Sequence, residues 1–277
     1  MARVVRPDGH TTLTHPTAVD DCLAVAESLA RAAGDMAMTG RRQGLSHVDT
    51  KSTLTDMVTE FDRASERLIV DGLRARRPHD SIVGEEGATH QGDSGLTWFI
   101  DPIDGTTNFY FDLPMWAVSI GVTDTKGPLA GVVYVPALRE LFSGSRGGGA
   151  HLNGQPITVR DNDRLSDALV CTGFSYSADA RVRQSRRIPG MVDKVRDLRR
   201  FGAAAIDLCF VAAGRLDAYF EENLHMWDLV AGQVIATEAG AVVSDFSGNS
   251  VRPEEVMAST PAIHRDLVAL LASVQAD

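Results

Sequence analysis

Two aspartates stand three positions apart in residues 98–109, which read Trp-Phe-Ile-Asp-Pro-Ile-Asp-Gly-Thr-Thr-Asn-Phe. The apolar residues before Asp101 are typical of a buried strand that ends at this carboxylate. Pro102 fixes its own φ and favours an extended conformation for Asp101, so we expect Asp101 and Asp104 to point off the strand end into one small volume. Close, unpaired carboxylates repel each other, which predicts a cation between them, and Mg²⁺ suits hard oxygen ligands of this kind.

The two residues that follow Asp104 are suited to binding an anion. Gly105 permits a tight turn that offers backbone N–H groups, and Thr106 adds a hydroxyl group. A divalent-cation site beside an anion-binding turn is typical of phosphoryl-transfer enzymes. On spacing alone, Thr106 is an ordinary turn residue.

Three further acids are candidates for the same site. Glu85 comes directly after a short apolar stretch and is followed by Glu86. Asp228 stands at the predicted start of one helix, and Asp62 stands just before another helical pattern. For a single carboxylate the default interpretation is a solvated loop acid. For Asp62 and Asp228 helix capping is a strong alternative.

Five segments of the chain resemble the inositol monophosphatase family, whose members are Mg²⁺-dependent, lithium-sensitive sugar-phosphate phosphatases. They occur in the family's order over roughly residues 17 to 272. Lys51 precedes the first segment, at the place where the family has a lysine. One such motif alone is a weak indication, but the five together are a strong one. The segments are D-M-V-T-E-F-D at 56–62, G-E-E-G at 84–87, D-P-I-D-G-T-T-N-F at 101–109, G-A-A-A at 202–205 and W-D-L-V-A-G at 227–232.

The resemblance implies both a fold and an activity. The fold is α/β (mixed α+β), a layered α-β-α-β-α sandwich of the sugar-phosphatase type with the site between its halves. The activity is hydrolysis of inositol monophosphate to inositol and phosphate by metal-activated water, without a covalent phosphoenzyme. The implied substrate is a small phosphorylated polyol, and the implied assembly is a homodimer, which a clean monomer in light scattering would refute.

The resemblance also implies how the carboxylates hold two or three Mg²⁺ ions. Glu85, Asp101 and the backbone carbonyl of Ile103 would hold one ion. Asp101, Asp104 and Asp228 would hold a second ion, and a third, weaker ion would lie near Glu85.

The implied catalytic residues are Asp62, Glu85 and Thr106. The hydroxyl of Thr106, paired with the carboxylate of Asp62, would help to take a proton from a metal-bound water whose pKa is already lowered. Lys51 would support the site by keeping Asp62 ionised. The backbone at Gly105 and Thr106 would bind the phosphate.

Six positions are implied as contacts to the substrate, and they are Asp104, Gly202, Ala203, Ala204, Glu221 and Asp228. His225 is an attractive general acid by type, but we interpret it as structural, because metal ions can stabilise the leaving oxygen instead. The segment from Phe174 to Ser185 is where we expect most divergence from relatives, so its role is left open. The arginines at 181–187 are interpreted as a solvated helix face, and the glycines after Arg146 as a hairpin turn.

Composition limits the alternatives. The chain has 277 residues, which suits one large or two small domains, and its net charge of −10 disfavours direct nucleic-acid binding. Its three cysteines lie far apart among apolar residues, which predicts core packing and a cytoplasmic location. The sequence has no apolar run long enough to span a membrane, and the first 16 residues lack the apolar region of a secretory signal.

The pattern of elements predicts mixed layers. Helices are expected over 17–33, ended near Gly34, and over 62–77, followed by a largely antiparallel sheet and then by alternating strands and helices from residue 168 onward. We expect a disordered extension at 1–16 and an inositol-monophosphatase-like domain at 17–277, with halves of about 17–160 and 161–277.

Two alternatives to inositol phosphate hydrolysis stay open. The first is a phosphatase for another small ester, such as fructose 1,6-bisphosphate or histidinol phosphate. The second is a regulatory binding protein on the same fold that contacts the transcription or ribosome machinery. A complete set of metal-binding carboxylates favours the enzymes, because a pure binding protein has no need of it.

Overall fold

The computed structural model describes residues 3–5, 11–13, 18–45, 48–51 and 57–274. Two short strands near the N-terminus, β1 (Arg3–Val5) and β2 (Thr11–Leu13), pair with each other. The other residues of the expected extension at 1–16 lie outside the described residues, as does Asp56 of the first family-like segment, so the disorder of this extension stays a prediction.

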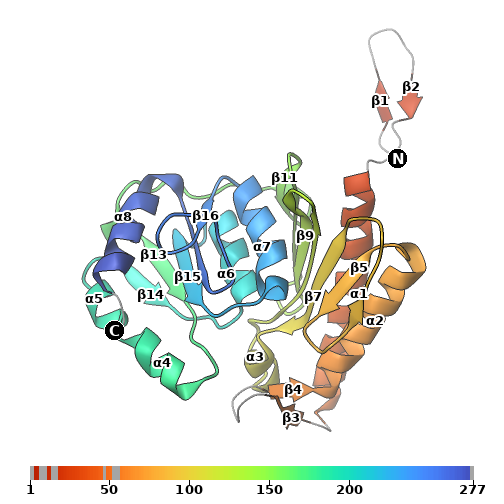
Figure 1. Ribbon diagram of the computed structural model, residues 1–277, viewed down its shortest axis with the longest axis horizontal. Helices are drawn as coiled ribbons and strands as arrows, with labels where there is room; N and C mark the ends of the chain where they lie inside the picture. The colour runs from red at the N-terminus through yellow and green to blue at the C-terminus, as the bar shows by residue number, and fades with distance from the viewer. Residues whose placement is uncertain (1–2, 6–10, 14–17, 46–47, 52–56, 275–277) are drawn as a thin grey trace.

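The described chain forms five layers, as Figure 1 shows. The outer helices α1 (Ala18–Gln43) and α2 (Glu60–Arg76) cover one face of an eight-stranded sheet. The helices α6 (Ala204–Ala212) and α7 (Met226–Glu238) fill the space between this sheet and a five-stranded sheet. Helix α8 (Pro261–Ser273) covers the outer face of the second sheet, and the layered α-β-α-β-α sandwich is thereby confirmed.

The first sheet has the order β12-β11-β10-β9-β8-β7-β5-β6. All of its pairs are antiparallel except β5 with β7. Because β5 and β7 are parallel, with Gly84 opposite Ile100, the residues that follow them meet at one edge of the sheet. The strands are β5 (Ser81–Gly84), β6 (Thr89–His90), β7 (Thr97–Asp104), β8 (Ala117–Asp124), β9 (Gly127–Val135), β10 (Glu140–Ser145), β11 (Gly149–Leu152) and β12 (Gln155–Pro156).

The second sheet has the order β14-β13-β15-β17-β16, in which β13 is parallel to both of its neighbours. Its strands come from the later part of the chain, and the division into halves near residue 160 stays a prediction. The strands are β13 (Leu169–Thr172), β14 (Asp197–Arg199), β15 (Ala218–Glu222), β16 (Val242–Ser244) and β17 (Glu255–Ser259).

Short elements complete the fold. Strands β3 (Val48–Thr50) and β4 (Met57–Thr59) form a small antiparallel pair. The short helices are α3 (Thr106–Tyr110), α4 (Ala178–Ser185) and α5 (Ile188–Met191), and a 3₁₀ turn spans Leu165–Asp167. The hairpin interpretation of the glycines after Arg146 is confirmed, because they connect β10 to β11.

The expected end of the first helix at Gly34 is wrong. Helix α1 continues to Gln43, and Gly34 lies within it. A Cβ atom at this position would come within 2.7 Å of Cδ1 of Tyr134, so the glycine lets the helix approach the sheet closely. Tertiary packing therefore outweighs the helix-breaking tendency of glycine, which is worth about 1 kcal/mol.

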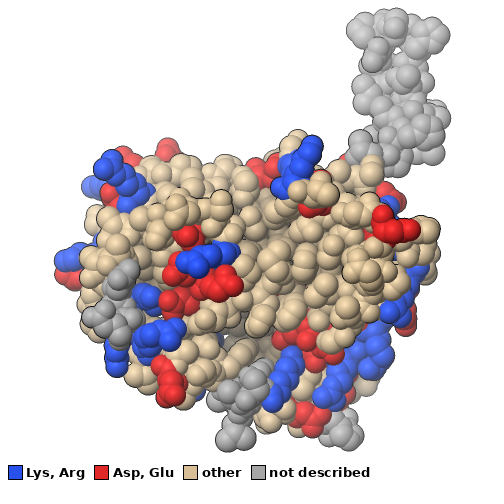
Figure 2. Space-filling model, in the orientation of Figure 1, with Lys and Arg blue, Asp and Glu red and all other residues tan. Residues whose placement is uncertain are grey.

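The surface charges and the three cysteines were the features for which the composition gave expectations. On the face shown in Figure 2, acidic and basic side chains are interspersed over the outer helices and sheet ends. Within the described residues, no helix is both long and apolar enough to cross a membrane. Cys22, Cys171 and Cys209 are free thiols and all three are buried, as core packing predicts.

Candidate active site

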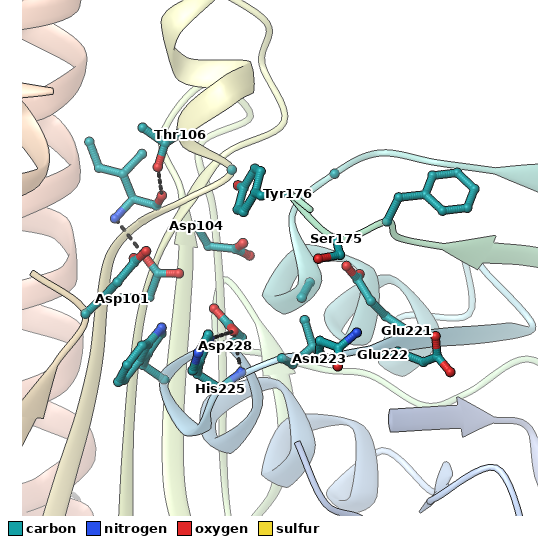
Figure 3. A pocket seen from close by; sticks show the side chains of 18 of the residues that line it. Asp101, Asp104, Thr106, Ser175, Tyr176, Glu221, Glu222, Asn223, His225 and Asp228 are labelled. Carbon is teal, nitrogen blue, oxygen red and sulfur yellow. Dashed lines mark hydrogen bonds and ion pairs between the residues drawn. The ribbon is translucent and has the colours of Figure 1, made fainter. Parts of the chain in front are cut away.

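A cavity of about 440 Å³ is lined by residues at the ends of elements from both sheets, and Figure 3 shows this lining. The end of β7, the turn into α3 and the start of α7 form one side. The end of β15, the turn before α6 and residues 174–177 form the other side. All of the predicted carboxylates except Asp62 line this cavity.

An acidic cluster lies on the first side of the cavity. Asp101, Asp104 and Asp228 each offer one carboxylate oxygen, and these oxygens lie within 4.8 Å of one another. Strand β7 does not stop at Asp101 as expected but continues to Asp104, with a shift of register against β8 between the two. This irregularity brings both carboxylates to the same side, although side chains three positions apart on a regular strand point to opposite faces.

Metal ions fit the chemistry of this cluster. Asp101 and Asp104 are buried, and burial together with the neighbouring carboxylates raises the pKa of each well above its usual range. Ionised carboxylates at this spacing require a positive charge between them, and hard oxygen donors suit Mg²⁺. The residues that would hold such an ion are Glu85, Asp101, Asp104, Asp228 and the carbonyl of Ile103.

Lys51 contacts two acids at the edge of the cluster. Its ammonium group donates to Glu85 at 2.9 Å and also to Glu86. Burial acts to lower the pKa of Lys51, but the two glutamates outweigh it and the pKa is raised. The lysine was expected to act on Asp62, yet its direct partners are the glutamates, and its charge is the weakest of the influences on the Asp62 pKa.

Thr106 and Asp62 form the hydrogen-bonded pair that the resemblance implies. The hydroxyl of Thr106 lies 3.1 Å from Oδ1 of Asp62 and 3.1 Å from the carbonyl oxygen of Ile103, both of which accept. Thr59, not Asp62, is the N-cap of α2, and Oδ2 of Asp62 accepts from the backbone N–H of Thr59 at 2.8 Å. Burial raises the pKa of Asp62 to about 6.

The turn after Asp104 has a conformation that requires glycine. Gly105 has φ of +90°, and a Cβ atom there would lie 2.9 Å from the carbonyl oxygen of Met115. The side-chain amide of Asn108 donates to that same oxygen at 2.6 Å and to the carbonyl of Phe201 at 2.8 Å. The turn is thereby fixed to both halves of the fold, and Thr106 begins helix α3 beside the cavity.

The second side of the cavity carries the positions expected to touch the alcohol. Gly202, Ala204 and Glu221 line the cavity, whereas Ala203 is packed in the core behind them. The backbone N–H of Ala205 donates to Oδ2 of Asp104 at 2.8 Å, which joins this side to the acidic cluster.

Glu221 lies at the end of strand β15 with its carboxylate fixed. The hydroxyl of Tyr219 donates to its Oε2 at 2.7 Å. A Cβ atom on Gly173 would come within 1.8 Å of that same oxygen, so the glycine leaves the room that the carboxylate occupies. Burial raises the pKa of Glu221 to about 7.

Asp228 occupies the third position of α7, not the N-cap. His225 is the N-cap residue, and its backbone N–H donates to Oδ2 of Asp228 at 2.7 Å. The His225 ring stacks on Trp227 with centroids 4.7 Å apart. The capping alternative and the metal alternative for Asp228 are therefore compatible, since one oxygen caps the helix while the side chain also belongs to the acidic cluster.

Two residues that support the site were missed in the sequence. The carboxylate of Glu66 accepts from the backbone N–H groups of Glu86 and Ala88, at 2.8 and 3.0 Å, and so fixes the turn that carries Glu85. Asn108 is the second. A signal for Glu66 does exist, because an acid at this position interrupts the buried stripe of α2 that includes Ile69 and Leu73.

These features define a class: a five-layered α/β protein whose inter-sheet cavity combines a cluster of acidic side chains with a tight glycine turn. Comparison with known proteins narrows this class. The sequence profile of the Inositol monophosphatase family matches residues 18–276, and the chain belongs to this family of phosphatases.

Individual relatives agree with the family assignment. The chain is 43% identical over 234 residues to Inositol-1-monophosphatase SuhB of Mycobacterium tuberculosis, covering 81% of each chain. It is 36% identical to a protein named Nus factor SuhB of Pasteurella multocida, covering 89% of this chain and 94% of the other. Among solved structures, extragenic suppressor protein suhB of Bartonella henselae superposes with a TM-score of 0.86 at 34% identity, covering 91% of this chain and 98% of that one.

Proposed function

We propose that the protein is a Mg²⁺-dependent phosphomonoesterase that hydrolyses inositol monophosphate to inositol and phosphate. The observation that carries the proposal is the cluster of Asp101, Asp104 and Asp228, whose oxygens lie within 4.8 Å of one another beside the Gly105 turn. A buried group of acids of this kind is unfavourable without a cation, so it indicates a site shaped by metal binding.

The metal-binding residues in this proposal are Glu85, Asp101, Asp104, Asp228 and the carbonyl of Ile103. When bound there, Mg²⁺ supplies positive charge that lowers the pKa of water and neutralises the phosphate. Lys51 neutralises part of the charge of Glu85 and Glu86 at the edge of the site.

Thr106 and Asp62 handle the proton of the attacking water. Because the Thr106 hydroxyl donates to Asp62 or to the Ile103 carbonyl, its oxygen is left to accept a hydrogen bond from water in the cavity. Asp62 is buried behind Thr106 and accepts the proton through that hydroxyl, as a general base. The N–H groups of the turn at Gly105 and Thr106 bind phosphoryl oxygens.

An assay against a panel of phosphate esters tests the proposal. The panel contains inositol 1-phosphate, fructose 1,6-bisphosphate, histidinol phosphate and an aryl phosphate, each with Mg²⁺ and with an excess of chelator. We expect inositol phosphate to be hydrolysed with the highest kcat/KM, hydrolysis to vanish with chelator and Li⁺ to inhibit. Activity that survives exhaustive chelation would contradict the metal-dependent mechanism, and a better ester in the panel would replace inositol phosphate as the substrate.

Glu221 is expected to select the alcohol. Its carboxylate accepts hydrogen bonds from hydroxyl groups, and one such bond to a charged acceptor is worth about 1.5–3 kcal/mol. We expect Glu221→Ala to lower kcat/KM for inositol phosphate about tenfold to a hundredfold and to leave an aryl phosphate nearly unchanged. Equal losses on both esters would assign Glu221 to support of the metal site instead. Glu140→Ala is the control, since Glu140 pairs with Arg215 at 2.6 Å and does not line the cavity.

A second candidate function has one specific observation in its favour, the similarity to a protein named Nus factor SuhB. In this alternative the fold contacts the transcription machinery and the cavity is secondary. Binding to purified RNA polymerase by an inactive Asp101→Asn variant would support it.

We also propose that the protein is a homodimer, and light scattering measures this assembly directly. A cytoplasmic location stays a prediction.

A further inference from the structure

The cavity has a wall that the family-like segments do not contain. Residues Phe174, Ser175, Tyr176 and Ser177 all line it, and they connect strand β13 to helix α4. Figure 3 shows the ring of Tyr176 pointing toward Asp104, close to Thr106, while Glu221 lies further along the cavity. The wall therefore faces the part of the site where the anion-binding turn lies.

Hydrogen bonds of polar side chains hold this wall in place. The side-chain oxygen of Gln184, which is 4% exposed, accepts from the backbone N–H of Ser175 at 2.8 Å. The Ser177 hydroxyl caps α4, and the backbone N–H of Ser177 donates to the hydroxyl of Ser175 at 3.2 Å. Nearby, Arg187 pairs with Glu222 at 2.8 Å and lies over the ring of Phe246. Tyr176 is therefore presented by a loop whose backbone is held at both ends.

Tyr176 supplies a neutral hydrogen-bond donor beside the acidic cluster, in a cavity whose lining also includes the donor side chains of Arg200 and Asn223. The surrounding carboxylates only accept hydrogen bonds, and the ammonium group of Lys51 is engaged by Glu85 and Glu86. A phenol is neutral near pH 7, so it donates without adding charge.

We propose that Tyr176 is a phosphate-binding residue whose hydroxyl donates a hydrogen bond to a phosphoryl oxygen of the ester, and that Gln184 positions it. The assignment rests on the proposed phosphatase function. It differs from the role proposed for Glu221, because Figure 3 shows Tyr176 near Asp104, whereas Glu221 lies further along the cavity, where we propose that the alcohol binds. Loss of the hydroxyl should therefore affect every phosphate ester equally.

The test measures binding of inorganic phosphate in Mg²⁺ buffer by isothermal titration calorimetry. We expect Tyr176→Phe to weaken phosphate binding about tenfold, corresponding to one hydrogen bond to a charged acceptor. Tyr134→Phe is the matched control. It removes the same hydroxyl from a tyrosine that donates to Asp35 at 2.8 Å outside the cavity, and it should bind phosphate as the unaltered protein does. Unchanged phosphate affinity in Tyr176→Phe, or absence of phosphate binding by the unaltered protein, would overturn the proposal.

Kinetics and a double-mutant cycle complete the test. Tyr176→Phe should lower kcat/KM equally for inositol phosphate and aryl phosphate, and a loss confined to inositol phosphate would overturn the assignment to the phosphoryl group. Gln184→Ala should weaken phosphate binding by a similar factor, and the double variant should lose little more, since both act through one contact. If the unaltered protein binds phosphate but hydrolyses no ester, the proposed function fails while the titration still decides the role of Tyr176.

Discussion

Replacing Asp101 with asparagine should lower kcat by about 10³-fold or more and should at the same time raise the stability of the metal-free protein. The loss of activity follows because the side chain belongs to the proposed metal site, and charge stabilisation by a metal ion is worth several kcal/mol. The gain in stability follows because the buried carboxylate is repelled by Glu85, Asp104 and Asp228. Asparagine retains the oxygen that accepts from the Ile103 N–H at 3.0 Å.

The sign of this effect can be checked with pH. A carboxyl group whose folded-state pKa is raised binds protons more tightly when folded, so its ionised form reduces stability as pH rises above its unfolded-state pKa of about 3.9. In chelator, the melting temperature of Asp101→Asn should therefore exceed that of the unaltered protein at pH 8, and the difference should shrink toward pH 4. A large drop in melting temperature at pH 8 would mean that Asp101 is structural.

Asp80 provides a control of opposite sign. It is buried outside the cavity and accepts from Arg77 and from the Trp98 ring nitrogen, both at 2.8 Å. Burial acts to raise the pKa of Asp80, but Arg77 and the other donors outweigh it, and the pKa is lowered. Asp80→Asn should therefore destabilise the protein near neutral pH, with an effect that fades as pH falls through the folded-state pKa, and should leave kcat unchanged.

Replacing Thr106 with alanine should lower kcat by about 10² to 10⁴-fold, the usual contribution of a positioned general base. Alanine removes the hydroxyl that joins the cavity to the buried carboxylate of Asp62. Thr106→Ser should restore most of the activity, because serine keeps the hydroxyl. Thr107→Ala is the neighbouring control, since Thr107 belongs to the same helix but does not line the cavity.

The pH profile gives this prediction a second readout. With a pKa of about 6, Asp62 takes up a proton as the solution becomes more acidic, and it then no longer accepts one from Thr106. Activity of the unaltered protein should fall below about pH 6, and Thr106→Ala should lack this decline. An identical acid limb in both proteins would show that another group is responsible.

The sequence was most informative where chemistry and chain neighbourhood coincide. Asp101, Asp104, Gly105 and Thr106 belong to one continuous segment, so their residue types and spacing predicted that they act together. Glu85 was linked to them by the resemblance, and the parallel pairing of β5 with β7 supplies the physical reason, because it brings both strand ends to one edge.

Features that depend on three-dimensional packing were not predictable in this way. The partners of Lys51 depend on where the segment after β3 lies against the turn at Glu85, which no local pattern encodes. The continuation of α1 through Gly34 depends on the ring of Tyr134, one hundred residues later in the chain. The place of Tyr176 in the cavity depends on the hydrogen bond from the backbone N–H of Ser175 to the side chain of Gln184. The sequence shows only that this segment is polar and does not reveal the hydrogen bond.

The hydrogen bonds around the cavity connect distant parts of the chain. Asp104 and Ala205 are 101 residues apart, Asn108 and Phe201 are 93 apart, and Ser119 and Trp227 are 108 apart. Contacts of such long sequence separation close large loops. The chain loses conformational entropy when these loops close, and the contacts give net stabilisation only after they have compensated for that loss. The cavity is therefore complete only when segments from the early and the late parts of the chain have folded and docked, so a measurement of ligand binding would report on the folding of both parts.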